Sequence, residues 1–264
     1  MNRSRHRRLI CGSLALATCL HAGAPAFAQT TPVTARPSAV AGGGDGTLFD
    51  ELISSTLTDF GRFPSHETLT WVGVGVAIAA FGHTADQAAT AALSGSRGLD
   101  AVFAPGETLG GARLQLAGAA ATYAIGRFTG SRRVAQVGAD LVRAQILTQA
   151  ITAGVKMSVR RGRPDGTRFS FPSGHASVTF ASATVLQRNF GWKAGIPAYG
   201  FATYVAASRI QGKRHFLSDV AFGAAIGIAA GRTVTIGRGG REFALGPVAV
   251  PGGGGVQFTW VGQQ

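Results

Sequence analysis

The sequence is poor in cysteine, in acidic residues and in lysine. Its only cysteines are Cys11 and Cys19, and its 12 Asp+Glu stand against 25 Lys+Arg, which gives a formal net charge of +13. Charged residues make up only 14% and hydrophobic residues 45% of the 264 residues, a balance that excludes an intrinsically disordered chain and allows a substantial core. The 39 glycines follow no collagen period. The charge excess first suggests a polyanionic partner, such as nucleic acid or a membrane surface.

The first 28 residues have the pattern of a secretory signal peptide. Four arginines, at positions 3, 5, 7 and 8, precede an apolar stretch over 9–20, and Ala26-Phe27-Ala28 offers a small-x-small cleavage site. The apolar stretch of about 12 residues is short for the roughly 20 that a spanning helix needs, although an N-terminal anchor stays the alternative. We therefore expect a cleaved signal peptide over 1–28 and a periplasmic protein, with membrane association left open.

Cleavage would change both the charge and the sulfur content of the chain. The mature protein would carry 21 basic and 12 acidic residues, a net charge of +9, and no cysteine. It would therefore have no disulfide, no thiol nucleophile and no thiolate metal site, although it enters an oxidising compartment. Packing alone has to stabilise it.

Helical blocks dominate the remainder of the sequence. Residues 29–46 are rich in Thr, Pro, Ala and Gly and predict a linker. Residues 47–231 consist largely of Ala, Leu, Val, Ile and Gly in blocks of 12 to 18 residues, which predicts an all-α bundle of about six to seven helices. The expected helices cover 48–60, 67–81, 111–128, 135–157, 175–189, 194–210 and 218–230.

Two features of this architecture stay open at the level of sequence. Most uncharged stretches run 12 to 15 residues, which favours a soluble or peripherally bound bundle, while the many Gly and Ala also fit close helix packing in lipid. Residues 232–264 alternate apolar and polar positions between glycine clusters. They predict a small C-terminal β-hairpin, with a flexible glycine-rich tail as the alternative.

Three polar clusters interrupt the apolar sequence between positions 156 and 219. The first ends a predicted helix, the second begins one, and the third lies at the start of the last one. They are Lys156 with Arg163-Pro164; Pro172-Ser173-Gly174-His175; and Ser208-Arg209 with His215 and Asp219.

Each cluster has an ordinary structural interpretation when it is taken alone. Ser173 is a good N-cap residue for the helix that follows it. His215 and Asp219 are four residues apart and could form a surface pair. The first cluster could be a solvated basic turn, made of Lys156, Arg160, Arg161, Arg163 and Arg168.

The second and third clusters also allow more specific chemistry. A helix that begins at Ser173 presents free backbone N–H groups and the positive end of its dipole to a phosphate, and His175 there could donate a proton to a leaving oxygen. If the last turn is helical, His215 and Asp219 share one face. The carboxylate then accepts a hydrogen bond from one imidazole nitrogen and leaves the other free as a base, a ligand or a nucleophile.

Together the clusters supply the parts of a phosphoryl-transfer site. Lys156, Arg163 and Arg209 can offset charge on the phosphate oxygens, where transition-state stabilisation matters most. One histidine can attack while the other protonates the leaving oxygen. The three motifs, in this order, resemble the signature of the type 2 phosphatidic acid phosphatase superfamily, which also contains bacterial non-specific acid phosphatases and vanadium haloperoxidases.

The resemblance implies a fold and a set of roles. It implies a helical bundle with the site at one end and a reaction that uses neither metal nor cofactor. It also implies that His215 is the nucleophile that forms a phosphohistidine, that Asp219 orients it, and that His175 acts as general acid and then as base. The residues implied to bind the phosphate oxygens are Lys156, Arg163, Ser173, Gly174 and Arg209, and Ser208 belongs to the third motif.

The expected function is therefore that of a phosphoric monoester hydrolase, an acid phosphatase or a lipid phosphate phosphatase, in the cell envelope. Its expected partner is a phosphorylated small molecule or lipid, with a membrane surface as a second contact and without nucleic acid. The Ser-Phe-Pro-Ser-Gly-His context favours the lipid-phosphate branch. A vanadium-dependent haloperoxidase and a non-catalytic, anion-binding envelope protein remain the alternatives. Vanadate should inhibit a phosphatase but activate a haloperoxidase.

Overall fold

The computed structural model describes residues 12–17, 48–94, 97–236, 241–250 and 253–262. The chain divides into two compact units, Gly44–Ile236 on the one hand and Met1–Gly43 with Gly237–Gln264 on the other. Within the described residues the larger unit is all-helical, which confirms the predicted fold class for this unit. The expected linker over 29–46 lies outside the described residues, and so does the expected signal peptide apart from Gly12–Ala17.

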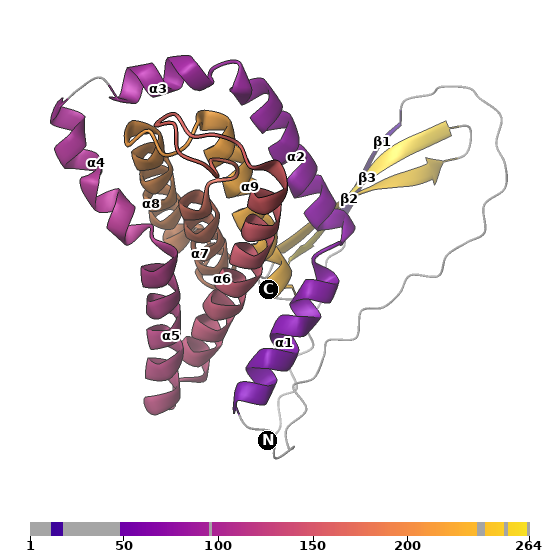
Figure 1. Ribbon diagram of the computed structural model, residues 1–264. Coiled ribbons are helices and arrows are strands. Elements are labelled where there is room, and N and C mark those ends of the chain that lie inside the picture. Colours follow the sequence, from indigo (N-terminus) through magenta and orange to yellow (C-terminus); the bar gives the residue numbers. More distant parts are fainter. Residues whose placement is uncertain (1–11, 18–47, 95–96, 237–240, 251–252, 263–264) are drawn as a thin grey trace, which may run out of the picture. The chain divides into compact units, whose positions relative to one another are not determined.

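The described part of the larger unit contains nine helices (Figure 1), so the predicted count of six to seven is wrong. Residues 86–109, to which the sequence analysis assigned no helix, form two of them. Glycines at 95, 98 and 106 and a proline at 105 interrupt this stretch, which leaves too little apolar periodicity to identify a helix. The nine helices are α1 (Leu48–Arg62), α2 (His66–His83), α3 (Asp86–Ser94), α4 (Arg97–Leu109), α5 (Ala112–Phe128), α6 (Arg132–Val159), α7 (Gly174–Phe190), α8 (Trp192–Gln211) and α9 (Leu217–Val234).

Serine side chains cap the starts of several helices. Ser131 Oγ accepts a hydrogen bond from the Val134 backbone N–H at the start of α6, and Ser65 caps α2 in the same way. The C-cap of α6 is Arg160, whose φ of 52° lies in the left-handed region that non-glycine residues rarely adopt. The chain therefore turns abruptly at Arg160, into the segment that contains Arg163-Pro164 of the first motif and leads to the second motif.

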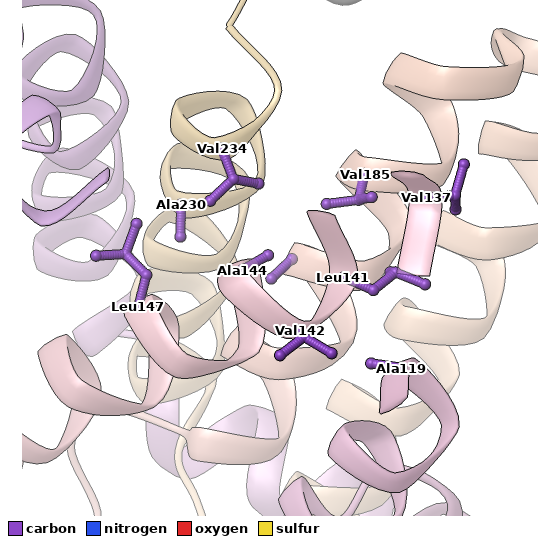
Figure 2. Close-up of a cluster of buried hydrophobic side chains, with 10 residues drawn as sticks. Ala119, Val137, Leu141, Val142, Ala144, Leu147, Val185, Ala230 and Val234 are labelled. Atoms are coloured by element: carbon purple, nitrogen blue, oxygen red, sulfur yellow. The ribbon is translucent and has the colours of Figure 1, made fainter. Parts of the chain in front are cut away.

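Helix α6 lies at the centre of the hydrophobic core. Its buried side chains pack against α5 on one side and against α7 and α9 on the other (Figure 2). Full burial of a Leu- or Val-sized side chain contributes roughly 1.5–3 kcal/mol, so this cluster is a main source of stability. Its members are Ala119, Val137, Leu141, Val142, Ala144, Leu147, Ala181, Val185, Ala230 and Val234.

A stripe of glycines lets α9 approach α7 very closely. Gly223, Gly227 and Gly231 are four residues apart and so share one face of α9. A Cβ atom added at any of them would come closer than 3.0 Å to an atom of α7 or its N-cap, which only a shift of a helix could relieve. The atoms met would be Ser173 O at 2.5 Å, Ser177 O at 2.2 Å and Thr184 Cβ at 2.6 Å.

The smaller unit contains a three-stranded antiparallel sheet in its described residues. The strands are β1 (Gly12–Ala17), β2 (Arg241–Val250) and β3 (Gly253–Gly262), in the order β1-β3-β2. This arrangement differs from the isolated C-terminal hairpin that the sequence suggested. Its third strand, β1, falls within the segment expected to be removed as a signal peptide.

The close approach of α7 and α9 predicts that Gly227→Ala is destabilising. The new methyl group would meet the Ser177 carbonyl oxygen, a backbone atom that can move only with its helix. We expect a loss of about 1–3 kcal/mol in the free energy of unfolding, measured by denaturant titration.

Gly118→Ala is the matched control, because a Cβ at this exposed position in α5 would meet nothing within 4 Å. This variant should gain about 0.8–1 kcal/mol from the higher helix propensity of alanine. Equal stability changes in the two variants would contradict the close helix approach.

Candidate active site

The three predicted clusters meet where α6 and α8 end and where α7 and α9 begin. The segment from α6 to α7 lies beside the segment from α8 to α9 (Figure 1), and the Asp165 N–H donates to the Lys213 carbonyl at 3.2 Å. Arg214 also forms an ion pair with Asp165, with 3.1 Å between Nη1 and Oδ2. The glycine stripe keeps the starts of α7 and α9 close together. There the Ser173 N–H donates to the Asp219 carbonyl at 3.0 Å.

His215 is held with one ring nitrogen engaged. The residue is 4% exposed, and its Nδ1 lies 2.6 Å from the carbonyl oxygen of Ser170. A carbonyl oxygen can only accept, so Nδ1 carries the proton and the lone pair of the neutral ring is on Nε2. Burial lowers the pKa of His215 below the ordinary histidine value, and the neighbouring Asp219 carboxylate only partly opposes this. His215 is therefore a neutral imidazole with Nε2 free to attack.

Asp219 lies beside His215 without the direct hydrogen bond that a helical turn over both residues would have allowed. His215 precedes α9 rather than lying on it, and its Nδ1 is 3.8 Å from Asp219 Oδ2. The carboxylate is 0% exposed and accepts hydrogen bonds from the Phe216 N–H at 2.8 Å and from the Ser170 hydroxyl. Burial alone would raise the pKa of Asp219, but His215 and these donors outweigh it and lower the pKa. Ser170 thus contacts both Asp219 and His215.

His175, in the first turn of α7, faces the C-terminal part of α4. Its Nε2 lies 3.0 Å from the carbonyl oxygen of Glu107, so this nitrogen carries a proton. Burial and the charge of Arg209 lower the pKa of His175 to about 4. The Glu107 carboxylate is 62% exposed and lies 3.5 Å from Arg209 Nη2. The sequence analysis gave no indication that Glu107 borders the site.

Lys156 supports the loop before α7. Its Nζ donates to the carbonyl oxygens of Phe169 at 2.7 Å and of Pro172 at 2.8 Å. An ammonium group has three donors, so one remains for a further acceptor. Burial and the charge of Arg163 lower the pKa of Lys156 to about 8. The solvated basic turn that the sequence allowed for Lys156 is therefore wrong.

Arg163 and Arg209 each carry a buried nitrogen without a hydrogen-bond partner. In both side chains the unpartnered atom is Nε. A buried guanidinium N–H with no acceptor costs free energy, and an anion with several oxygens would satisfy it. Burial lowers the pKa values of both Lys156 and Arg209, and the positive charge of Arg163 lowers them further. The cations of this region therefore repel one another. These observations indicate an anion-binding site.

The N-terminus of α7 completes this site. Ser173 is the N-cap and is 0% exposed, and its hydroxyl accepts a hydrogen bond from the Ala176 N–H. Gly174 is the first residue of the helix, where backbone N–H groups have no partner within the helix. A Cβ added at Gly174 would meet only Thr152 Cγ2, at an ordinary 3.9 Å. Packing within the chain therefore does not explain the glycine, and the open space beside these N–H groups could admit an anion.

Ser208 has a structural role in the third motif. It is 3% exposed, and its hydroxyl donates to the Val205 carbonyl at 2.7 Å within α8. Its side chain also fills the space beside Gly106 of α4, where a Cβ would lie 2.5 Å from Ser208 Oγ. Ser208 thereby holds the end of α4 that carries Glu107 against α8.

A buried polar network behind the site escaped the sequence analysis. Arg161 belongs to it, although the sequence allowed a solvated turn there, and its side chain is only 21% exposed. The network is formed across long stretches of sequence, with no short motif to reveal it. Its other members are Asp86, Ser170, Ser218 and Asp219.

The comparisons with known proteins agree with the three motifs. Residues 158–241 match the family model of the PAP2 superfamily. This segment contains both histidines, Asp219, Arg163 and Arg209, while Lys156 lies two residues before it.

Two relatives of known activity match parts of the chain. One is a lipid A 1-phosphatase from Porphyromonas gingivalis, 42% identical over 85 residues, which are 31% of this chain and 19% of that protein. The other is a decaprenylphosphoryl-5-phosphoribose phosphatase from Mycobacterium tuberculosis, 36% identical over 108 residues, which are 37% of this chain and 59% of that protein. The matched part thus spans less than two thirds of either relative.

A solved structure has a similar fold. The crystal structure of a transmembrane PAP2 type phosphatidylglycerolphosphate phosphatase from Bacillus subtilis superposes with a TM-score of 0.52 at 20% sequence identity. The alignment covers 64% of this chain and 94% of that structure. At this identity the similarity concerns the arrangement of helices alone.

The free space at Gly174 predicts a variant that loses anion binding without losing stability. In Gly174→Ala, the methyl group would occupy the space beside the first-turn N–H groups of α7 but would clash with no atom of the chain. We expect affinity for inorganic phosphate to fall by about tenfold or more, measured by calorimetry. Denaturant unfolding should show a stability within about 0.5 kcal/mol of the unmodified protein. Unchanged phosphate affinity would contradict the placement of the anion at this helix end.

Proposed function

Since residues 158–241 match the family model of the PAP2 superfamily, we propose that this protein is a metal-independent phosphatase of that superfamily, which hydrolyses lipid phosphates through a phosphohistidine on His215. The orientation of His215 carries the proposal, because Nδ1 is engaged with Ser170 and Nε2 is left as a nucleophile. The unpartnered nitrogens of Arg163 and Arg209 supply positive charge for the phosphate oxygens.

In the first step, His215 Nε2 attacks phosphorus and the bond from phosphorus to the leaving oxygen breaks. Lys156, Arg163, Arg209 and the first-turn N–H groups of α7 offset the charge on the three remaining oxygens. His175, in its protonated form, donates a proton to the leaving oxygen. Its Nε2 already points at an oxygen acceptor, the Glu107 carbonyl, in the protein without substrate.

In the second step, water attacks the phosphohistidine. His175, now neutral, accepts a proton from the water, and the phosphorus–nitrogen bond breaks to regenerate the free imidazole of His215. Inorganic phosphate is then the product. All charge stabilisation comes from side chains and backbone groups that the three motifs provide, so the reaction needs no metal ion.

A lipid phosphate is the substrate class that the relatives favour. Both curated relatives are named for the removal of phosphate from lipid-linked molecules. Apolar side chains of α2 are exposed, among them Phe81 at 81% and Leu69 at 60%, and such a surface suits contact with a membrane. Among the described residues, one helix, α9, is long and apolar enough to cross a bilayer. The bent pair α2–α3 would add a second candidate if the two helices together form a single span. Of the 18 residues of α9, 72% are buried within the protein.

We place the site on the periplasmic side of the membrane. The expected signal peptide over 1–28 would export the protein, and an envelope phosphatase has to reach its lipid substrate. A cleaved leader would also remove four arginines, so the basic residues of the three motifs become a larger share of the positive charge.

The nucleophile assignment predicts that His215→Ala abolishes phosphate release from an aryl phosphate. We expect a loss of at least about 10⁴-fold in kcat, because no other group can form the covalent intermediate. His66→Ala, which replaces an exposed histidine at the start of α2, is the matched control and should retain full activity. A chelator such as EDTA should not reduce the activity of the unmodified protein. Substantial turnover by His215→Ala would exclude this mechanism, and loss of activity in EDTA would exclude its independence of metal.

The two histidines predict an acidic pH optimum. Nucleophilic attack needs neutral His215, whose pKa is lowered, so this requirement is met down to pH values below the ordinary histidine pKa of 6.5. Proton donation needs charged His175, whose pKa is about 4, so this form disappears as the pH rises. Since kcat/KM reports the free enzyme, it should be highest below pH 6.5, after correction for ionisation of the substrate. An optimum above about pH 7.5 would contradict the assigned roles.

A further inference from the structure

Arg161 lies between Lys156 and Arg163 of the first motif without being one of the residues predicted to bind phosphate, yet it contacts Asp219, the residue that supports the proposed nucleophile. Its Nη1 donates to Asp219 Oδ1 at 2.7 Å and to Ser218 Oγ at 2.7 Å. Its Nη2 donates to Asp86 Oδ2 at 2.7 Å, and its guanidinium carbon lies 4.3 Å from the centre of the Phe216 ring. Both terminal nitrogens are thus engaged with protein atoms, unlike the Nε atoms of Arg163 and Arg209.

Asp86 fixes Arg161 from the opposite side. This residue begins α3 and is 2% exposed. Its Oδ1 accepts from the Ser218 N–H at 2.9 Å, and its Oδ2 accepts from the Ser218 hydroxyl at 2.8 Å. Asp86 therefore satisfies a first-turn N–H of α9 and at the same time holds the guanidinium group in place.

The two oxygens of Asp219 have different tasks. Oδ1 receives the Arg161 hydrogen bond, while Oδ2 faces the Ser170 hydroxyl, the Phe216 N–H and His215 Nδ1. A carboxylate held at one oxygen by a guanidinium group cannot rotate freely, so the second oxygen keeps its direction. That oxygen positions Ser170, whose carbonyl oxygen in turn accepts a hydrogen bond from His215 Nδ1.

We propose that Arg161, anchored by Asp86, is a positioning residue for the nucleophile: it holds Asp219 so that Ser170 and His215 keep the orientation in which Nε2 attacks phosphorus. This inference rests on the proposed function of His215. It assigns Arg161 to the chemical step rather than to binding of the phosphate. Its pair with Asp219 is buried, so removing one partner leaves an uncompensated charge.

The inference predicts a loss of kcat with little change in KM. In Arg161→Met we expect kcat to fall by about 10- to 100-fold, as is typical when an outer partner of a reactive group is removed. KM for an aryl phosphate should stay within about twofold, whereas Arg209→Met should mainly raise KM. Arg161→Lys keeps the charge but cannot bridge two carboxylates, and it should recover only part of the loss.

The pH profile and the histidine tautomer give readouts that a purely structural role would not change. The charge of Arg161 helps to lower the pKa of Asp219, although neighbouring hydrogen bonds contribute more. Its removal therefore raises this pKa and moves the acidic limb of the kcat profile to higher pH. In ¹⁵N NMR spectra, His215 of the unmodified protein should be protonated at Nδ1, and Arg161→Met should show a mixture of tautomers.

Asp86→Asn tests the anchor, and Arg232→Met is the matched control. Arg232 lies on α9 and, like Arg161, pairs with a carboxylate, the exposed one of Glu67, but no described contact joins it to the network or the site. Asp86→Asn should reproduce the kcat loss, and the Asp86→Asn/Arg161→Met double variant should lose little more than either single variant. Arg232→Met should keep the kcat and pH profile of the unmodified protein.

Unchanged phosphate affinity in Arg161→Met would show that the variant is folded. An unchanged kcat in both network variants, a loss confined to KM, or an unaltered tautomer would overturn the inference. Failure of the proposed function itself would differ from these results, because the unmodified protein would then release phosphate independently of His215.

Discussion

The close contact between α7 and α9 is the constraint on which the candidate site depends. Gly223, Gly227 and Gly231 let α9 approach α7 closely, and the two helix N-termini are joined by a hydrogen bond from Ser173 N to Asp219 O. One helix start brings His175 and the N–H groups that we propose to bind phosphate. The other brings Asp219 and, just before it, His215. A wider helix spacing would separate His215, the proposed nucleophile, from the phosphate position proposed at the start of α7.

Balance of charge is the second condition for this arrangement. Cations come from α6, from the segment after it and from α8, and burial together with repulsion from neighbouring cations lowers the pKa values of Lys156, His175 and Arg209. The carboxylates near them already have partners, as Asp219 is hydrogen-bonded within the network and Asp165 is paired with Arg214. Positive charge is therefore in excess where phosphate is proposed to bind. A part of the unusual basic charge of the chain is explained by this concentration at one site.

Sequence reasoning succeeded where the chemistry is encoded locally. The long apolar blocks predicted α6 to α9 with small boundary errors, and the three predicted motifs lie together where these helices end and begin, while their role in phosphate binding stays a prediction. It failed at Arg161, whose partners Asp219 and Asp86 lie 58 and 75 residues away, and at Glu107, 68 residues from His175. It predicted the last helix over 218–230 and allowed a helical turn that would bring His215 and Asp219 onto one face, but α9 begins at Leu217 and His215 lies before it. Such contacts depend on the tertiary fold, and α3 and α4, which bring Asp86 and Glu107, were the helices that glycine and proline concealed.

The most direct test of the account is to trap the phosphorylated protein. An aryl phosphate with a good leaving group should phosphorylate His175→Ala faster than water can remove the phosphate, because the first step then needs little acid catalysis and the second lacks its base. After an alkaline quench, mass spectrometry of the peptides should find one phosphoryl group on His215, and treatment with acid should release it. A phosphoryl group on a different residue, or turnover without any covalent phosphate on His215, would contradict the central claim.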